Sequence, residues 1–320
     1  MIDMPSMLRM EDVVAAGGRI AADIRPVTLL LADADTVAPS AAVLFAAEFL
    51  QHTGSFKARG AANFIAAHLA DGTMPDTGVV IASGGNAGLA CAWAARRHGV
   101  KATVFVPETT PRPKIARMLD YGADLRRVGR EYAEAAHASE AFAATTGALR
   151  SHAYDNSLIA AGAGTLMLEI IEAAGNGLDT VVVSVGGAGL LAGLTTVAAA
   201  HGILVVAVEP EGAQTFHAAQ AAGMPVDVPV HSIAADSLGA RRITPLALAA
   251  SDHVRSVLVT DDAIIRARQH LWDTYRIAVE HAAGTAVAAV LTGTYVPREG
   301  ERVVIILCGA NTDPSDLVAS

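Results

Sequence analysis

The strongest constraint on the fold of this chain is a series of short apolar runs that alternate with longer segments. Four runs rich in Val, Ile and Leu lie in the second half of the chain, at residues 181–185, 204–208, 256–260 and 303–307. Continuous apolar runs of this length are typical of parallel strands that helices cover on both faces. The alternation therefore predicts an α/β fold with parallel sheets flanked by helices.

The same alternation occurs on a smaller scale in the middle of the chain. Strands are expected over residues 79–82, 102–106 and 124–128, and each is followed by a helical segment. Three consecutive strand–helix units make a compact parallel lobe. We predict that this small lobe comprises residues 76–152 and is inserted into a large lobe formed by residues 1–75 and 153–320.

The amino-terminal part of the chain has weaker patterns. Apolar positions from Met7 to Val14 predict an amphipathic helix, and Pro26 ends that segment. Residues 27–31 and 42–50 are short β-leaning runs. We expect them to form an antiparallel pair just before residue 51.

Composition excludes several classes of protein. The chain has 320 residues and a net charge of -9, which argues against a nucleic-acid partner because phosphate binding needs a basic surface. No apolar run reaches a membrane-spanning length and the amino terminus lacks a secretory signal, so we expect a cytoplasmic protein with no membrane partner. Cys91 and Cys308 lie far apart and give neither a disulfide framework nor a metal-ligand spacing.

Residues 51–60 contain the first candidate for chemistry, Lys57. Apolar residues after it recur at helical spacing, and Thr53 or Ser55 can cap the first turn. A lysine at a helix start or in a partly dry pocket has a lowered pKa, which makes its amine a nucleophile. The alternative is an ordinary surface lysine on a capped helix.

The segment Thr53-Gly54-Ser55-Phe56-Lys57-x-Arg59-Gly60-Ala61 resembles the lysine motif of the fold-type II pyridoxal phosphate (PLP) enzymes, on the serine/threonine dehydratase branch. In that family the lysine holds the cofactor as a Schiff base, so the resemblance implies that Lys57 is catalytic and that Phe56 and Lys57 bind PLP. It also implies a two-lobed fold like that of the tryptophan synthase β chain. Ala58 favours the dehydratases, because related synthases usually have aspartate there.

A second stretch, residues 83–88, reads Ser-Gly-Gly-Asn-Ala-Gly between an expected strand and an expected helix. Free amides at a helix start favour an anion, although a tight βα turn without function has the same composition. The resemblance implies that Ser83, Gly84, Asn86 and Ala87 bind the substrate carboxylate and that Asn86 also contacts PLP. Serine racemases usually have a second serine at the position of Gly84, so racemisation is disfavoured.

A third stretch, residues 183–193, is a strand that runs into glycines and then into a helix. Convergent amides and a helix dipole make this a general phosphate site, and a dinucleotide loop is the weaker alternative because the glycine spacing does not match. The resemblance implies that the PLP phosphate binds at Gly186, Gly187, Ala188 and Gly189, with Ala188 replacing a family glycine.

Two further residues gain a role only through the resemblance. Cys308 follows the last expected strand, where a lone thiol is more often simple core packing. In the family a serine or cysteine at this position faces the pyridine nitrogen, and Glu280 matches a glutamate near the cofactor. A neutral partner for that nitrogen weakens the electron sink, which favours prompt loss of a β-substituent.

The family also has a cation site near a Glu-Pro pair. Glu209 and Ala213 match it, but Thr215 stands where many relatives have aspartate. Because calcium or magnesium prefers several oxygen ligands, we expect no metal here.

The motifs together resemble those of an ammonia-lyase for a β-hydroxy amino acid. L-threonine and L-serine are the first candidate substrates, and a 2-oxo acid and ammonia are the products that the family implies. Another β-hydroxy amino acid such as 3-hydroxyaspartate is the alternative, followed by a racemase or a β-replacement synthase. A nucleotide-binding module or a PLP protein without turnover stays open. The family also implies a homodimer.

Overall fold

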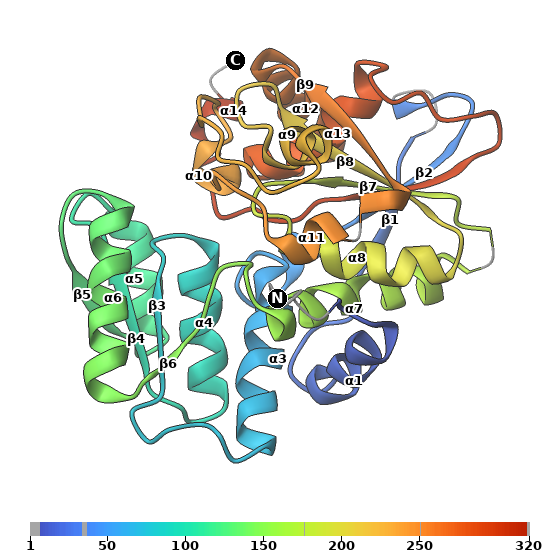
Figure 1. Ribbon diagram of the computed structural model, residues 1–320. Helices are drawn as coiled ribbons and strands as arrows, with labels where there is room; N and C mark the ends of the chain where they lie inside the picture. Colours follow the sequence, from blue (N-terminus) through green and yellow to red (C-terminus); the bar gives the residue numbers. More distant parts are fainter. Residues whose placement is uncertain (1–6, 34–36, 176, 250, 319–320) are drawn as a thin grey trace.

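The computed structural model describes residues 7–33, 37–175, 177–249 and 251–318 and contains two separate sheets (Figure 1). The larger sheet has six strands. In spatial order they are β1 (Leu29–Leu31), β2 (Ala42–Ala46), β10 (Arg302–Ile306), β7 (Thr180–Ser184), β8 (Leu204–Pro210) and β9 (Val254–Val259). Every neighbouring pair is parallel except β1 and β2. The parallel α/β architecture predicted from the apolar runs is confirmed.

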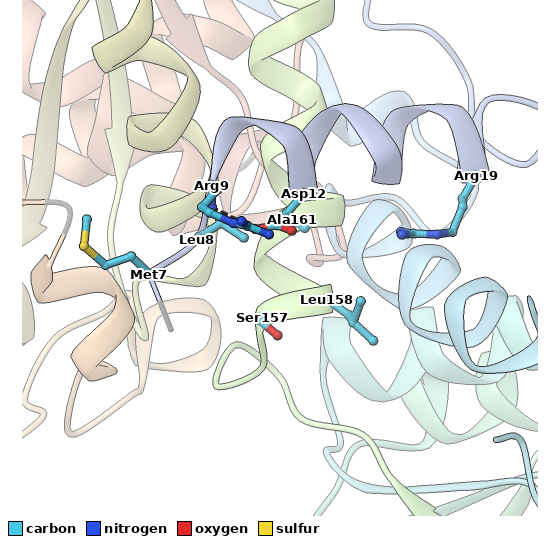
Figure 2. A pocket seen from close by; sticks show the side chains of 8 residues that line it. All are labelled: Met7, Leu8, Arg9, Asp12, Arg19, Ser157, Leu158 and Ala161. Atoms are coloured by element: carbon cyan, nitrogen blue, oxygen red, sulfur yellow. Dashed lines mark hydrogen bonds and ion pairs between the residues drawn. The ribbon is translucent and has the colours of Figure 1, made fainter. Parts of the chain in front are cut away.

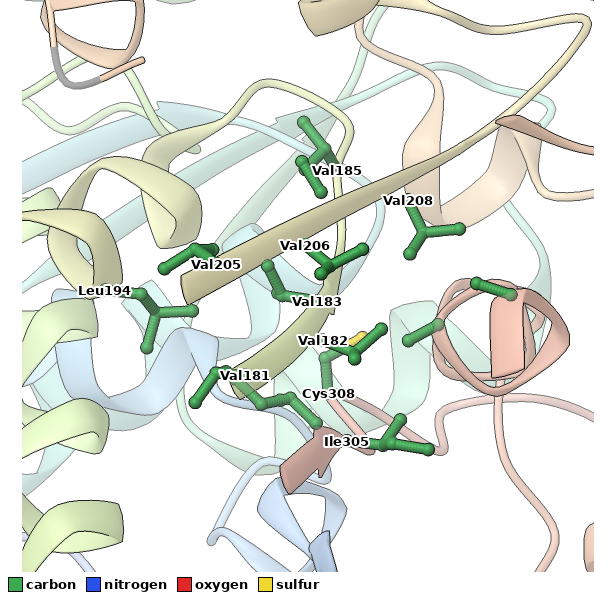
Figure 3. Packing of buried hydrophobic residues seen from close by; sticks show 14 of the residues in the cluster. Val181, Val182, Val183, Val185, Leu194, Val205, Val206, Val208, Ile305 and Cys308 are labelled. Carbon is green, nitrogen blue, oxygen red and sulfur yellow. The ribbon is translucent and has the colours of Figure 1, made fainter. Parts of the chain in front are cut away.

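Helices cover both faces of this sheet, which explains why its strands are apolar throughout. The helices of this part of the fold are α1 (Met10–Ile20), α7 (Ser157–Ala174), α8 (Gly189–Ala200), α12 (Asp261–Tyr275) and α13 (His281–Leu291). Both α8 and α13 contact β8, and they lie on opposite sides of the sheet in Figure 1. Figure 3 shows the resulting core, in which valines of β7 and β8 meet Leu194 of α8 and Ile305 of β10.

The smaller sheet has four parallel strands. They are β5 (Asp124–Arg127), β4 (Ala102–Val106), β3 (Val79–Ala82) and β6 (Leu149–Arg150), in this order, with helices α4 (Asn86–Arg97), α5 (Arg112–Asp120) and α6 (Tyr132–Thr146). Three of these strands were predicted. The fourth, β6, was missed because two residues are too few to show a pattern. All four strands fall between residues 79 and 150, and the lobe boundaries at residues 76 and 152 stay a prediction.

Helix α3 (Lys57–Ala70) lies between the two sheets and packs against α4 and α7. Ala58, Phe64 and Ile65 of α3 are fully or almost fully buried, and they belong to the apolar cluster that also contains the strands of the smaller sheet. The first residue of this helix is Lys57. The lysine is therefore placed where the two halves of the molecule meet.

The remaining described elements are short. They are α9 (Thr215–Ala222), α10 (Ala235–Leu238), α11 (Pro245–Ala249), α14 (Ser315–Val318) and the 3-10 turns η1 (Glu48–Leu50) and η2 (Ser251–His253). At the amino terminus, β1 and β2 form the predicted antiparallel pair, but β2 also pairs with β10 and so joins the large sheet. Residues 48–50 turn instead of extending β2, and α1 ends at Ile20, well before Pro26.

One helix in the described part of the chain, α7, passes a length and composition test for a membrane span. Its 18 residues have a mean hydropathy of 1.5, so the expectation that no run is long enough was wrong on this measure. The test is weak evidence, because 61% of the helix is buried inside the molecule. Its apolar surface packs against α1, α3 and α8.

A buried ion cluster ties α3 to its neighbours. Arg59 is 0% exposed, and its guanidinium contacts Glu48 at 2.7 Å and Glu169 at 2.6 Å. Glu48 belongs to η1 and Glu169 to α7, so one side chain joins three elements around the lysine. Arginine suits this place because its planar fork can donate to both carboxylates at once.

Replacing Arg59 by alanine should destabilise the protein strongly. The substitution leaves buried carboxylate charge without its partner, and such losses cost about 3–5 kcal/mol. As a control, Arg150→Ala removes an exposed pair with Glu140, which is worth at most about 1 kcal/mol. Urea unfolding of both variants measures the difference. Equal and small losses would show that the cluster does not hold α3 in place.

Candidate active site

Lys57 begins α3 without the side-chain cap that the sequence suggested. The N-cap position is Phe56, and no side chain accepts a hydrogen bond there. Thr53 instead directs its hydroxyl to the carbonyl of Ser55 at 3.4 Å, and the Ser55 hydroxyl is buried without a partner among the described residues. The prediction of Thr53 or Ser55 as the cap was therefore wrong.

The physical reason is a backbone connection between this turn and the end of the last strand. The amide of Phe56 donates to the carbonyl of Cys308 at 3.0 Å, and the amide of Ala310 donates to the carbonyl of Gly54 at 2.9 Å. These bonds fix the approach to α3 and leave the side chains of residues 53 and 55 unable to reach its first turn. They also place Cys308 next to Lys57.

The amine of Lys57 is enclosed. Its Nζ atom donates to the carbonyl of Ala153 at 2.8 Å and lies 4.8 Å from the centre of the Phe56 ring. Burial lowers the pKa of Lys57 to about 8, against a smaller opposite effect of Cys308 and Glu280. Near pH 8 about half of the amine is unprotonated, which is the form that attacks a carbonyl or removes a proton.

The segment that contains Ala153 connects Lys57 to the glycine-rich loop. Tyr154, the next residue, packs its ring so closely on Gly187 that a Cβ there would lie 2.3 Å from the ring. A Cβ at Gly189 would lie 2.9 Å from Cβ of Tyr154. Lys57 and the loop thus contact adjacent residues of one segment. The sequence analysis missed Tyr154, because residues 151–156 carry no periodic pattern.

The loop at residues 186–189 follows β7 and opens α8, so its amides point along the start of a helix. Ala188 is the N-cap residue, with φ at 63° and ψ at 14°, in the left-handed region. An alanine amide is therefore available, but the backbone conformation costs about 1–2 kcal/mol in a residue with a Cβ. The small side chains keep this helix start open to an anion.

Asn86 starts α4 and binds two residues from the carboxy-terminal part of the chain. Its Nδ2 atom donates to both carboxylate oxygens of Glu280 at 2.9 Å, and its Oδ1 atom accepts from Nδ2 of Asn311 at 2.7 Å. The backbone amide of Asn311 also donates to Glu280 at 2.9 Å. The structure thus brings Asn86 and Glu280 together, and their contact with the cofactor stays a prediction. Asn311 was given no role, although a polar residue just after a strand was a usable signal.

Glu280 and Cys308 are both buried, at 4% and 5% exposure. Burial raises the pKa of Glu280, and the hydrogen bonds from Asn86 and Asn311 partly offset that effect. Burial, with a contribution from Glu280, raises the pKa of Cys308 to about 12. Cys308 is therefore a neutral thiol, and its sulfur lies 3.6 Å from the hydroxyl of Ser184.

Residues 83–85 form the loop between β3 and α4, and residues 86 and 87 open the helix. Ser83, Gly84, Asn86 and Ala87 are all half-buried, and the Ser83 hydroxyl accepts from the amide of Gly85 at 3.3 Å. A Cβ at Gly84 would lie 2.9 Å from the hydroxyl of Thr110. The loop presents the open start of a helix, as the sequence analysis expected of an anion site.

Glu209, at the end of β8, does not fit a cation site. The carboxylate accepts from the amides of Phe216 at 2.7 Å and His217 at 2.8 Å and from the Thr215 hydroxyl at 3.0 Å. Burial raises the pKa of Glu209 to about 7. Ala213 has no side-chain oxygen, so one carboxylate that already has three donors is a poor ligand set for magnesium or calcium. The described residues hold no cluster of three His, Cys, Asp or Glu side chains suited to a metal.

A cavity of about 420 Å³ lies beside α1 (Figure 2). Its lining comprises Met7, Leu8, Arg9, Asp12, Arg19, Ser157, Leu158 and Ala161. None of the residues described above lines it. The chemistry of the side chains, rather than this cavity, locates the candidate active site.

Comparison with known proteins identifies the family of this chain. Residues 20–309 match the family model described as pyridoxal-phosphate dependent enzyme. The chain belongs to this family. Its cofactor is therefore pyridoxal 5'-phosphate, and its fold is the fold-type II arrangement expected from the motifs.

Individual relatives carry different activities in their names. A serine dehydratase-like protein of Mus musculus is 35% identical over 277 residues, which cover 82% of this chain and 83% of the relative. A phenylserine dehydratase of Ralstonia pickettii is 36% identical over 282 residues, covering 86% and 84%. The solved structure of maize serine racemase has a TM-score of 0.90 at 28% identity and covers 97% of this chain and 96% of the racemase.

The residues present fit the cofactor. Lys57 offers an amine with a pKa of about 8, and the loop at 186–189 offers convergent amides in a cradle that larger side chains would fill. The two lie against neighbouring residues of the same segment. A phosphorylated aldehyde needs both an amine and an anion site within one small volume.

Replacing Ala188 by glycine should stabilise the protein by about 0.5–1 kcal/mol, because glycine adopts the left-handed conformation without strain. Ala192→Gly in the same helix is the control and should destabilise, since residue 192 has ordinary helical neighbours. Urea unfolding of the cofactor-free protein measures both. A loss of stability at position 188 equal to that at 192 would contradict the assigned backbone conformation.

Lys57→Met should raise the thermal midpoint of the cofactor-free protein at pH 7. The pKa of Lys57 falls from 10.5 in the unfolded chain to about 8 on folding, so folding is penalised below pH 8 and the penalty disappears as pH rises toward 10.5. The gap between variant and wild type should therefore close over that range. Lys101→Met, at an exposed lysine, provides the control. A gap that does not change with pH would refute the burial of the Lys57 amine.

Proposed function

We propose that this protein is a PLP-dependent ammonia-lyase that converts L-threonine or L-serine, or both, to a 2-oxo acid and ammonia. The observation that carries the proposal is the pairing of one amine with a pKa of about 8, Lys57, with a substrate loop that has no side chain at Gly84. A single acid–base group on one side of the substrate suits elimination better than proton exchange between two faces.

Each part of the cofactor has a candidate partner among the residues described. Lys57 would hold it covalently next to Phe56, and the amides of residues 186–189 would hold its phosphate. Asn86 would contact an oxygen of the ring from the start of α4, where Glu280 and Asn311 hold its side chain. Cys308 would face the ring nitrogen with its thiol.

In the proposed reaction PLP supplies an electron sink for charge that develops at the α-carbon of the substrate. The amides and the hydroxyl of residues 83–87 bind the substrate carboxylate at the start of α4. Lys57 in its unprotonated form removes the α-proton, and the carbonyl of Ala153 orients the amine through the hydrogen bond at 2.8 Å. The β-hydroxyl then leaves as water with a proton equivalent to the one that Lys57 removed, and hydrolysis of the released enamine by water gives the 2-oxo acid and ammonia.

The neutral thiol of Cys308 favours elimination over reactions that need a long-lived carbanion. A carboxylate at this position would stabilise a positive charge on the ring nitrogen, whereas a thiol with a pKa of about 12 stays uncharged. Glu280 lies close enough to Cys308 to raise the pKa of the thiol further, and its carboxylate accepts hydrogen bonds from Asn86 and Asn311. The proposed roles of Cys308 and Glu280 follow from this arrangement.

Individual residues make other reactions less favoured than elimination. A racemase is disfavoured because Gly84 has no hydroxyl to act on the opposite face of the substrate, and a Cβ there would lie 2.9 Å from the Thr110 hydroxyl. A β-replacement synthase is disfavoured because residue 58 is a fully buried alanine, where those relatives usually carry aspartate. 3-Hydroxyaspartate remains the alternative substrate, and phenylserine joins it through the name of the Ralstonia relative. The proposal includes a cytoplasmic homodimer, whose assembly sedimentation equilibrium would test.

Lys57→Ala should abolish turnover while leaving the fold intact. Loss of a positioned acid–base group costs about 100- to 10,000-fold in rate, and loss of the amine also prevents covalent cofactor attachment. Release of ammonia and 2-oxo acid from threonine, serine, 3-hydroxyaspartate and phenylserine measures activity and substrate choice, and chiral analysis of recovered serine detects racemisation. Lys101→Ala is the control. A Lys57→Ala enzyme as active as wild type would refute the assignment.

A further inference from the structure

The hydroxyl of Thr215 lies between the glycine-rich loop and a buried carboxylate. Its Oγ1 atom is 2.6 Å from the carbonyl oxygen of Gly186 and 3.0 Å from Oε1 of Glu209. Thr215 is the first residue of α9 and is 0% exposed. No other side chain is recorded as a hydrogen-bond donor to the Gly186 carbonyl among the described residues.

Glu209 makes this hydroxyl a rigid group. Its two carboxylate oxygens accept the amides of Phe216 and His217, which are the orphan donors of the first turn of α9. The carboxylate thereby fixes α9 to the end of β8 and holds Thr215 at one place. The Thr215 hydroxyl has two acceptors within hydrogen-bond distance, the Gly186 carbonyl and the Glu209 carboxylate. The shorter distance is to the Gly186 carbonyl.

A fixed carbonyl at Gly186 also fixes the amide of Gly187. The two groups belong to one planar peptide unit and point in opposite directions. When Thr215 holds the carbonyl on the side of α9, the amide of Gly187 is directed away from α9. Thr215 thus controls the direction of one of the amides available to an anion.

We propose that Thr215 is a positioning residue for the phosphate of PLP, and that its hydroxyl holds the loop at Gly186 without a metal ion. The inference rests on the proposed assignment of residues 186–189 to the phosphate. It makes PLP binding independent of magnesium and calcium. The residues themselves give the reason, because the single carboxylate already accepts the amides of Phe216 and His217, one on each oxygen.

The experiment titrates cofactor-free protein with PLP and, separately, with pyridoxal, which lacks the phosphate. Thr215→Val keeps the shape and removes the hydroxyl, so PLP binding should weaken about 3- to 10-fold, the usual effect of losing one hydrogen bond, while pyridoxal binding stays unchanged. Thr215→Ser should bind both ligands as wild type does. Thr195→Val is the matched control, since Thr195 is 2% exposed and its hydroxyl has no partner among the described residues.

A second arm measures PLP affinity of wild-type protein after chelation and after addition of magnesium or calcium, and no change is expected. Three results overturn the proposal: unchanged PLP binding by Thr215→Val, equal loss of PLP and pyridoxal, or a gain in wild-type affinity on adding either cation. Failure of the proposed function looks different. In that case Lys57→Ala retains turnover, whereas the selective loss of PLP over pyridoxal in Thr215→Val persists.

Discussion

Burial of the Lys57 amine is the interaction on which the rest of the site depends. An ammonium group resists removal from water, so a lysine at this place either loses its proton or destabilises the fold. The structure allows the first outcome by lowering the pKa to about 8, and it keeps the amine oriented through one carbonyl, that of Ala153. Reactivity near neutral pH follows from this burial.

That burial requires parts of the chain that are far apart in sequence. The turn before Lys57 is bonded to residues 308 and 310 after the last strand, and the segment at 153–154 closes the other side against the glycine-rich loop. Arg59, two residues further along α3, anchors the same helix through Glu48 and Glu169. The buried arginine and the reactive lysine therefore lie in the same helix but differ in charge. Arg59 stays charged, whereas Lys57 loses its proton readily.

The sequence predicted the strands well because helices cover both faces, and continuous apolar runs record that burial directly. It predicted the positions of Lys57, Asn86 and residues 186–189 because each sits at a strand end or a helix start. The sequence analysis failed where backbone hydrogen bonds determine the local conformation. Residues 53 and 55 are of types that cap helices, but backbone hydrogen bonds to the segment after the last strand fix the turn that contains them. Tyr154 and the left-handed backbone of Ala188 depend on contacts across the fold, which no local pattern records.

The most direct test of the account asks which amine carries the cofactor. Holoenzyme is reduced with borohydride, which makes an amine–aldehyde linkage permanent. The reduced protein is then digested, and the masses of its peptides are measured by mass spectrometry. The account predicts the added pyridoxyl phosphate mass on the peptide that contains Lys57, in nearly every molecule. The same mass on a peptide of Lys101 or Lys114, or on none, would contradict it.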